Sequence, residues 1–155
     1  MQKQSLLLVF LLLLSAQLLN AQSNFITKWD MSKAAPQPTQ LSFGTATSGT
    51  VNYSWQEISP GTASGSGTWS GNTLTIAGLP ANAIIRLQIE PTNFQRININ
   101  SGSYRARLLE VEQWGTTAWT SMQGACYTCP NLQVTATDIP NLAEISHMSN
   151  MFTAC

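Results

Sequence analysis

Charged side chains are scarce in this 155-residue chain. Seven Lys and Arg balance seven Asp and Glu, and only 9% of the residues are charged, whereas an ordinary soluble domain has about 25%. Nucleic-acid binding requires a basic surface that neutralises phosphates, so this composition excludes that class of partner. The hydrophobic fraction is 43%, which is typical of globular chains and argues against disorder.

Histidine and cysteine are scarce too, which limits metal and redox chemistry. The only histidine is His147, and because a closed zinc site takes four ligands, we expect neither a metal nor a cofactor. Cys126 and Cys129 form a C-x-x-C, and Cys155 is the third cysteine. No βαβ pattern surrounds the C-x-x-C, so a thioredoxin-like redox pair is the weaker interpretation. We interpret the three cysteines as structural, either buried or joined in a disulfide bond.

A single long apolar run is present, and it lies near the N-terminus. Lys3 precedes the uninterrupted apolar residues 6–14, and small and polar residues follow up to Ala21. This pattern predicts a signal peptide over residues 1–21, with cleavage before Gln22. The run is shorter than the roughly 20 residues that a membrane-spanning helix needs. We therefore expect a secreted or cell-surface protein with no membrane span after cleavage.

Short alternating segments dominate residues 22–107. Apolar and polar residues alternate over 51–55 and again over 85–89, which is the pattern of strands with one buried face. Residues 67–76 carry a Ser-Gly-Asn turn between two further alternating stretches and predict a hairpin. Short strands separated by turns are typical of an antiparallel β-sandwich. The sequence therefore predicts a mainly β fold with a small antiparallel β-sandwich over residues 22–107.

From residue 108 onward the sequence repeats itself. A shift of 26 residues brings Met122 onto Met148 and Cys129 onto Cys155, and neighbouring apolar positions keep the same phase. This repetition favours stacked coils over residues 108–155. Strand-like stacking would place Cys129 and Cys155 about 5 Å apart, within the range of a disulfide bond. Two buried thiols in an apolar ladder are the alternative, and we favour them.

Six segments carry a resemblance to a known family, and they are FITKWD at 25–30, LLEVEQWG at 108–115, WTSM at 119–122, CPNL at 129–132, ATDIPNL at 136–142 and HMSNMF at 147–152. They resemble the BspA-like leucine-rich-repeat surface proteins, an exported bacterial family. The resemblance implies that 108–155 is the incomplete start of a leucine-rich-repeat solenoid that follows the sandwich, truncated after the first repeat. The sequence departs from the family pattern at Trp55-Gln56-Glu57, which lacks the usual Gly-Asp pair, and at Cys126, where an aromatic residue is usual.

The resemblance implies a function in adhesion or protein–protein recognition, without catalysis, and a host or matrix protein or a cell-surface glycan as partner. The alternative is a carbohydrate-binding accessory module of an extracellular enzyme. A glycosidase pair at Glu110 and Glu112 is a weaker interpretation. Trp114 and Trp119 are expected in the core. The basic residues of the later strands are expected on solvated faces, with an acidic-ligand site as the less favoured reading; they are Arg86, Arg96, Arg105 and Arg107.

Overall fold

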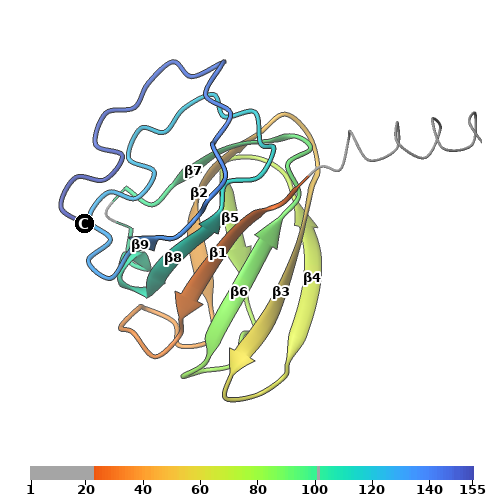
Figure 1. Ribbon diagram of the computed structural model, residues 1–155. Coiled ribbons are helices and arrows are strands. Elements are labelled where there is room, and N and C mark those ends of the chain that lie inside the picture. The colour runs from red at the N-terminus through yellow and green to blue at the C-terminus, as the bar shows by residue number, and fades with distance from the viewer. Residues whose placement is uncertain (1–22, 101) are drawn as a thin grey trace, which may run out of the picture.

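The computed structural model describes residues 23–100 and 102–155, and in this part of the chain the fold is mainly β (Figure 1). The predicted signal peptide, residues 1–21, lies outside the described residues. A 3-10 helix spans Arg105–Arg107. The strands are β1 (Phe25–Asp30), β2 (Leu41–Thr47), β3 (Val51–Ser59), β4 (Ser64–Trp69), β5 (Thr73–Ile76), β6 (Ile84–Ile89), β7 (Phe94–Asn98), β8 (Leu108–Gln113) and β9 (Gln133–Val134).

The strands form two sheets, which Figure 1 shows as two layers. One sheet has six strands in the order β4-β3-β6-β1-β8-β9, and the other has three in the order β5-β2-β7. All paired strands are antiparallel except β8 and β9, which are parallel. The predicted mainly β class is therefore confirmed. Strand β8 begins where the predicted sandwich ends, yet it pairs with β1 in the larger sheet.

The alternating pattern of the sequence explains how the two layers hold together. In β6, Ile85, Leu87 and Ile89 are each at most 1% exposed, while the residues between them lie on the outer face. Between the layers, the ring of Trp29 in β1 stacks on that of Phe43 in β2, with centroids 5.3 Å apart. Burial of a large apolar side chain contributes about 1.5–3 kcal/mol. These inner faces therefore supply most of the core that joins the two sheets.

The hairpin predicted over residues 67–76 is wrong. Strand β4 pairs with β3 in the larger sheet, whereas β5 pairs with β2 in the smaller one. The turn between β4 and β5 is held by β2, because Gly71 donates its backbone N–H to Thr47 Oγ1 (2.7 Å) and Thr45 donates its own to Asn72 O (2.9 Å). A turn signal predicts that the chain reverses, but not which strand each arm will pair with.

Two glycines of β4 explain why this low-complexity stretch is a strand rather than a linker. A Cβ atom at Gly65 would lie 2.7 Å from Trp55 Nε1, and one at Gly67 would lie 2.5 Å from Tyr53 Oη. Both aromatic rings come from β3, the neighbouring strand. Glycine at these positions lets the rings lie across β4. The half-buried rings thereby cover an edge strand that has few apolar side chains of its own.

The chain after β7 adds two segments that pair with each other, the inner segment (residues 108–132) and the outer segment (residues 133–155). Four backbone N–H groups of the inner segment each donate to the carbonyl 25 residues further along, at 2.9–3.0 Å. A constant offset of this kind is the mark of parallel pairing, with paired residues 26 apart. It reproduces the register of the sequence repeat. The bonds are Met122 to His147, Gly124 to Ser149, Cys126 to Met151 and Thr128 to Thr153.

The inner segment is also fixed to the smaller sheet. Ile99 donates its backbone N–H to Ala125 O at 3.1 Å, and Thr120 donates to Gln95 O at 3.1 Å. Figure 1 shows residues 114–132 of the inner segment and the outer segment side by side, next to β7. The inner segment therefore separates the outer segment from the two sheets. The outer segment packs against the rest of the molecule on one side only.

Candidate interaction surfaces

The structure places the three cysteines where the two segments meet. Cys126 and Cys129 are at most 1% exposed, Cys155 is exposed, and all three are free thiols. Cys155 Sγ donates a hydrogen bond to Cys126 O at 2.8 Å. Burial raises the pKa of the Cys126 thiol and raises the pKa of Cys129 to about 12. The C-x-x-C lies in a turn with no helix behind it, so it lacks the thiolate that thiol–disulfide exchange requires.

We expect the three thiols to differ in their reactivity toward iodoacetamide at pH 8. Cys155 should be alkylated in the folded protein, because its side chain is exposed. Cys126 and Cys129 should be alkylated only after unfolding in urea, because they are buried and protonated. Peptide mass spectrometry before and after unfolding measures the difference. Rapid alkylation of Cys126 or Cys129 in the folded protein would contradict this arrangement.

The two carboxylates considered for glycoside hydrolysis belong to a network of ion pairs on the outer face of the larger sheet. Lys28 of β1 bonds to Glu110 and, at 2.9 Å, to Glu112 of β8. Arg86 of β6 binds Glu112 with two nitrogens, at 2.6 and 3.0 Å. The Arg86 bond lowers the pKa of Glu112 to about 2, and the Lys28 bond lowers that of Glu110. A glycosidase needs one carboxyl with a raised pKa as its acid, so this pair does not fit that chemistry.

The later-strand arginines do not form one basic surface. Arg86 is paired with Glu112, and Arg96 donates to Gln123 O at 3.0 Å. Arg107 was expected on a solvated face, and that expectation is wrong, because its side chain is buried with 2% exposure. Its guanidinium binds backbone carbonyls of the loop between β1 and β2, so the residue has a structural role. The sequence offers no periodic signal for this burial, since Arg107 follows no strand pattern.

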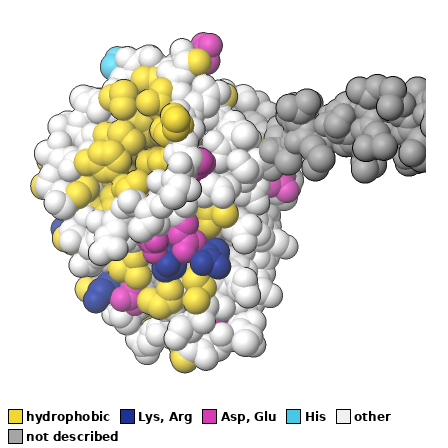
Figure 2. Space-filling view, viewed as in Figure 1, with side chains coloured by type: hydrophobic (Ala, Val, Ile, Leu, Met, Phe, Trp, Pro, Cys, Tyr) yellow, Lys and Arg dark blue, Asp and Glu magenta, His cyan; other side chains and the backbone are white. Residues whose placement is uncertain are grey.

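The outer segment carries an exposed apolar surface, which we call the end face. Figure 2 shows apolar side chains gathered over this part of the molecule. Monomeric proteins seldom leave several large apolar side chains together in water, and such patches mark interaction sites. The end face consists of Val134 (46% exposed), Ile139 (89%), Leu142 (37%), Met148 (47%) and Phe152 (44%).

Two residues of the end face repeat positions that are buried in the inner segment. Met122 and Cys126 of the inner segment are at most 1% exposed, and the chain that pairs with them is the outer segment. Their equivalents 26 residues later, Met148 and Phe152, lie on the end face. These apolar positions are thus covered by polypeptide in the inner segment and exposed in the outer segment.

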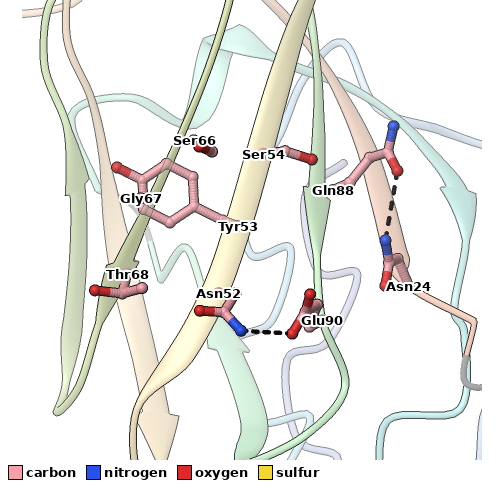
Figure 3. Close-up of a pocket in the computed structure, with 9 residues that line it drawn as sticks. All are labelled: Asn24, Asn52, Tyr53, Ser54, Ser66, Gly67, Thr68, Gln88 and Glu90. Carbon is pink, nitrogen blue, oxygen red and sulfur yellow. Dashed lines mark hydrogen bonds between the residues drawn. The ribbon is translucent and has the colours of Figure 1, made fainter.

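A second surface is a polar trough on the outer face of the larger sheet, with a cavity volume of about 330 Å³. It lies over β4, β3 and β6 and reaches the residue that precedes β1 (Figure 3). Among the described residues that line it, the carboxylate of Glu90 is the only charged group. The lining residues are Asn24, Asn52, Tyr53, Ser54, Ser66, Gly67, Thr68, Gln88 and Glu90.

This trough is not predicted from the sequence. The alternation over 51–55 does place Asn52 and Ser54 on the solvated face of one strand. The trough also requires the pairing of Ser54 with Gln88 across β3 and β6. Strand order decides which outer faces adjoin, and a single sequence does not specify that order.

Comparison of this chain with protein-family models, with curated proteins and with solved structures found no match in any of the three. Within residues 23–100 and 102–155, no helix combines the length and the hydrophobicity needed to cross a bilayer. The same residues contain no group of three or more His, Cys, Asp or Glu side chains that is able to hold a metal ion. The end face and the polar trough are therefore the features of the molecule that bear on its function.

Proposed function

We propose that this chain is an exported bacterial surface or secreted protein that recognises other proteins, and that its β-sandwich carries the start of a leucine-rich-repeat array. Its end face is the recognition surface, and adhesion to host or matrix proteins is the activity. The role is one of binding, not catalysis. The observation that carries this proposal is the parallel pairing of the two segments with an apolar row left open on the second.

The parallel pairing supports a repeat array because it is made by the main chain. Residues 26 apart pair through backbone hydrogen bonds, and both layers keep apolar side chains at the same positions. Repeat proteins stack in this way, each unit burying the apolar row of its neighbour. The chain segments with this register are those that resemble the BspA-like repeats. Export is supported by the signal-peptide pattern of residues 1–21.

The occupant of the end face is a protein because a polypeptide already covers the equivalent row one layer in. There, Met122 and Cys126 donate backbone N–H groups to His147 and Met151 while their side chains are buried. A partner segment that adds to the outer edge would gain main-chain bonds together with apolar burial, which is the logic of β-strand addition. The five residues of the end face are uncharged. The exposed Glu144 lies in the outer segment but is not one of these five residues.

The test is a binding measurement with two carboxylates introduced into the end face. The double variant Met148→Glu/Phe152→Glu should bind immobilised fibronectin, laminin or collagen at least about tenfold more weakly than the unsubstituted protein, a loss of roughly 1.4 kcal/mol. Surface plasmon resonance supplies the affinities. Both side chains are almost half exposed, so the substitutions should leave the unfolding temperature nearly unchanged.

The matched control is Ile58→Glu. Ile58 is 41% exposed and lies in β3, outside the end face, so a carboxylate introduced there should leave binding intact. Equal binding by the double variant and the unsubstituted protein would refute the end face as the recognition surface. Absence of binding to all three immobilised proteins would count against the adhesion proposal itself.

A further inference from the structure

The side chains that line the polar trough are almost all neutral and polar. Its outward-facing side chains are amides, hydroxyls and the carboxylate of Glu90, and among the described residues no Lys or Arg lines it. Asn52, Ser54 and Thr68 are exposed, so their polar atoms are open to a ligand. In Figure 2 the face over β3 and β4 is almost free of charged and apolar side chains. Other parts of the same sheet carry the ion-pair network instead.

Hydrogen bonds within the trough orient its side chains without saturating them. Asn52 Nδ2 donates to Glu90 Oε2 at 2.7 Å, and Asn24 Nδ2 donates to Gln88 Oε1 at 3.4 Å (Figure 3). A side-chain amide has two N–H donors and an oxygen with two lone pairs, and a carboxylate accepts at both oxygens. Each of these bonds uses one donor and one acceptor. Donors and acceptors of these side chains therefore remain available to a ligand, and the existing hydrogen bonds hold them in place.

We propose that the polar trough binds a neutral oligosaccharide. Sugar hydroxyls both donate and accept, so they match a lining that mixes amide N–H groups, amide oxygens, hydroxyls and a carboxylate. Phosphorylated or sulfated ligands are disfavoured because the described lining residues include no cation to pair with them. Lipids are disfavoured because the lining is mainly polar. The volume of about 330 Å³ lies at the small end of ligand sites, about 300–1,000 Å³, and suits a short oligosaccharide.

This inference is independent of the proposed function, because the trough and the end face lie at opposite edges of the larger sheet. The trough covers β4, β3 and β6, whereas the outer segment continues from β9 at the other end of the strand order. The two surfaces share no residue. Each is open to test while the other is left unchanged.

The experiment is an array of neutral and acidic oligosaccharides probed with the full chain, followed by calorimetric titration of the best neutral ligand. Asn52→Ala and Gln88→Ala should each weaken binding about tenfold. Gln56→Ala is the matched control, since Gln56 is exposed on the same strand as Asn52 but does not line the trough. It should bind like the unsubstituted protein. Affinity should not change with salt concentration, because no ion pair forms.

Three results would overturn the inference. One is unchanged binding by both Asn52→Ala and Gln88→Ala. Another is selection of acidic glycans with an affinity that falls as salt is added. The third is the absence of any neutral ligand on the array. The double variant Met148→Glu/Phe152→Glu should keep full glycan affinity, which separates failure of this inference from failure of the proposed protein recognition.

Discussion

Replacing Trp119 with alanine is expected to lower the free energy of unfolding by about 3–5 kcal/mol. The Trp119 side chain is 0% exposed and lies in the inner segment. Its ring makes edge contacts with Phe25 of β1, at 5.1 Å between centroids, with Phe94 of β7, at 5.4 Å, and with Trp114, at 6.3 Å. It therefore joins both sheets to the inner segment. Since small domains have a total stability of about 5–15 kcal/mol, this loss would remove a substantial part of it.

The variant Trp119→Phe separates ring packing from hydrogen bonding. Trp119 Nε1 is buried, and no hydrogen-bond partner for it is found among the described residues. An unsatisfied buried donor costs about 1–3 kcal/mol, so its removal should offset much of the volume lost on going to phenylalanine. We expect Trp119→Phe to cost less than about 1.5 kcal/mol. Urea unfolding of both variants measures the two effects.

Ile58→Ala is the control for Trp119, because Ile58 is 41% exposed and its truncation should change stability by less than about 1 kcal/mol. If Trp119→Phe and Trp119→Ala unfold at the same urea concentration, the ring contacts do not carry the stabilisation. Equal stability of Trp119→Ala and the unsubstituted protein would contradict its role in joining the sheets to the inner segment.

The strands and the 26-residue register were the parts of the fold that the sequence predicted well. A strand with one buried face must alternate, as Ile85, Leu87 and Ile89 do. A repeated segment that pairs with its own copy through the main chain must keep a constant spacing, as Met122 and Met148 do. Both features are periodic, so a single sequence is enough to read them. The burial of Trp114 and Trp119 follows the same expectation.

Other features depend on pairings that no period encodes. The arms of the turn at 70–72 join different sheets because β2 binds the turn with Thr45 and Thr47. The trough depends on β3 lying between β4 and β6, so that Asn52 meets Glu90 across 38 residues of sequence. Long-range strand order of this kind is decided by the whole core. The sequence therefore predicts what each strand buries better than which strand lies beside it.

The same limit applies to Arg107, whose burial no pattern predicted and whose loss should have the second large effect. Its side chain is 2% exposed, and its guanidinium donates to Lys33 O (2.9 Å), Gln37 O (3.1 Å) and Gln40 O (2.7 Å). These carbonyls lie in the loop that connects β1 to β2, one strand from each sheet. The Tyr104 ring lies 5.7 Å from the guanidinium carbon. One side chain thus satisfies the polar backbone of the connection between the layers.

We expect Arg107→Met to lower the free energy of unfolding by about 3 kcal/mol or more, because three hydrogen bonds from a charged donor are lost and each such bond contributes about 1.5–3 kcal/mol. Arg107→Lys should restore little of it, since a single ammonium cannot reproduce the planar set of donors. Denaturation in guanidinium chloride measures both variants, and limited proteolysis reports opening of the loop.

Arg96→Met is the matched control for Arg107, since Arg96 donates a hydrogen bond to Gln123 O and its Nε is buried without a partner in the described chain. It should cost less than about 1 kcal/mol. The decisive comparison is between the two methionine variants. If Arg107→Met unfolds at the same denaturant concentration as Arg96→Met, the loop carbonyls find other partners, and the guanidinium does not hold the connection. If only Arg107→Met has a lower free energy of unfolding and is cleaved in the loop, the buried guanidinium stabilises the connection between the sheets. It does so in place of the apolar contacts that this polar loop lacks.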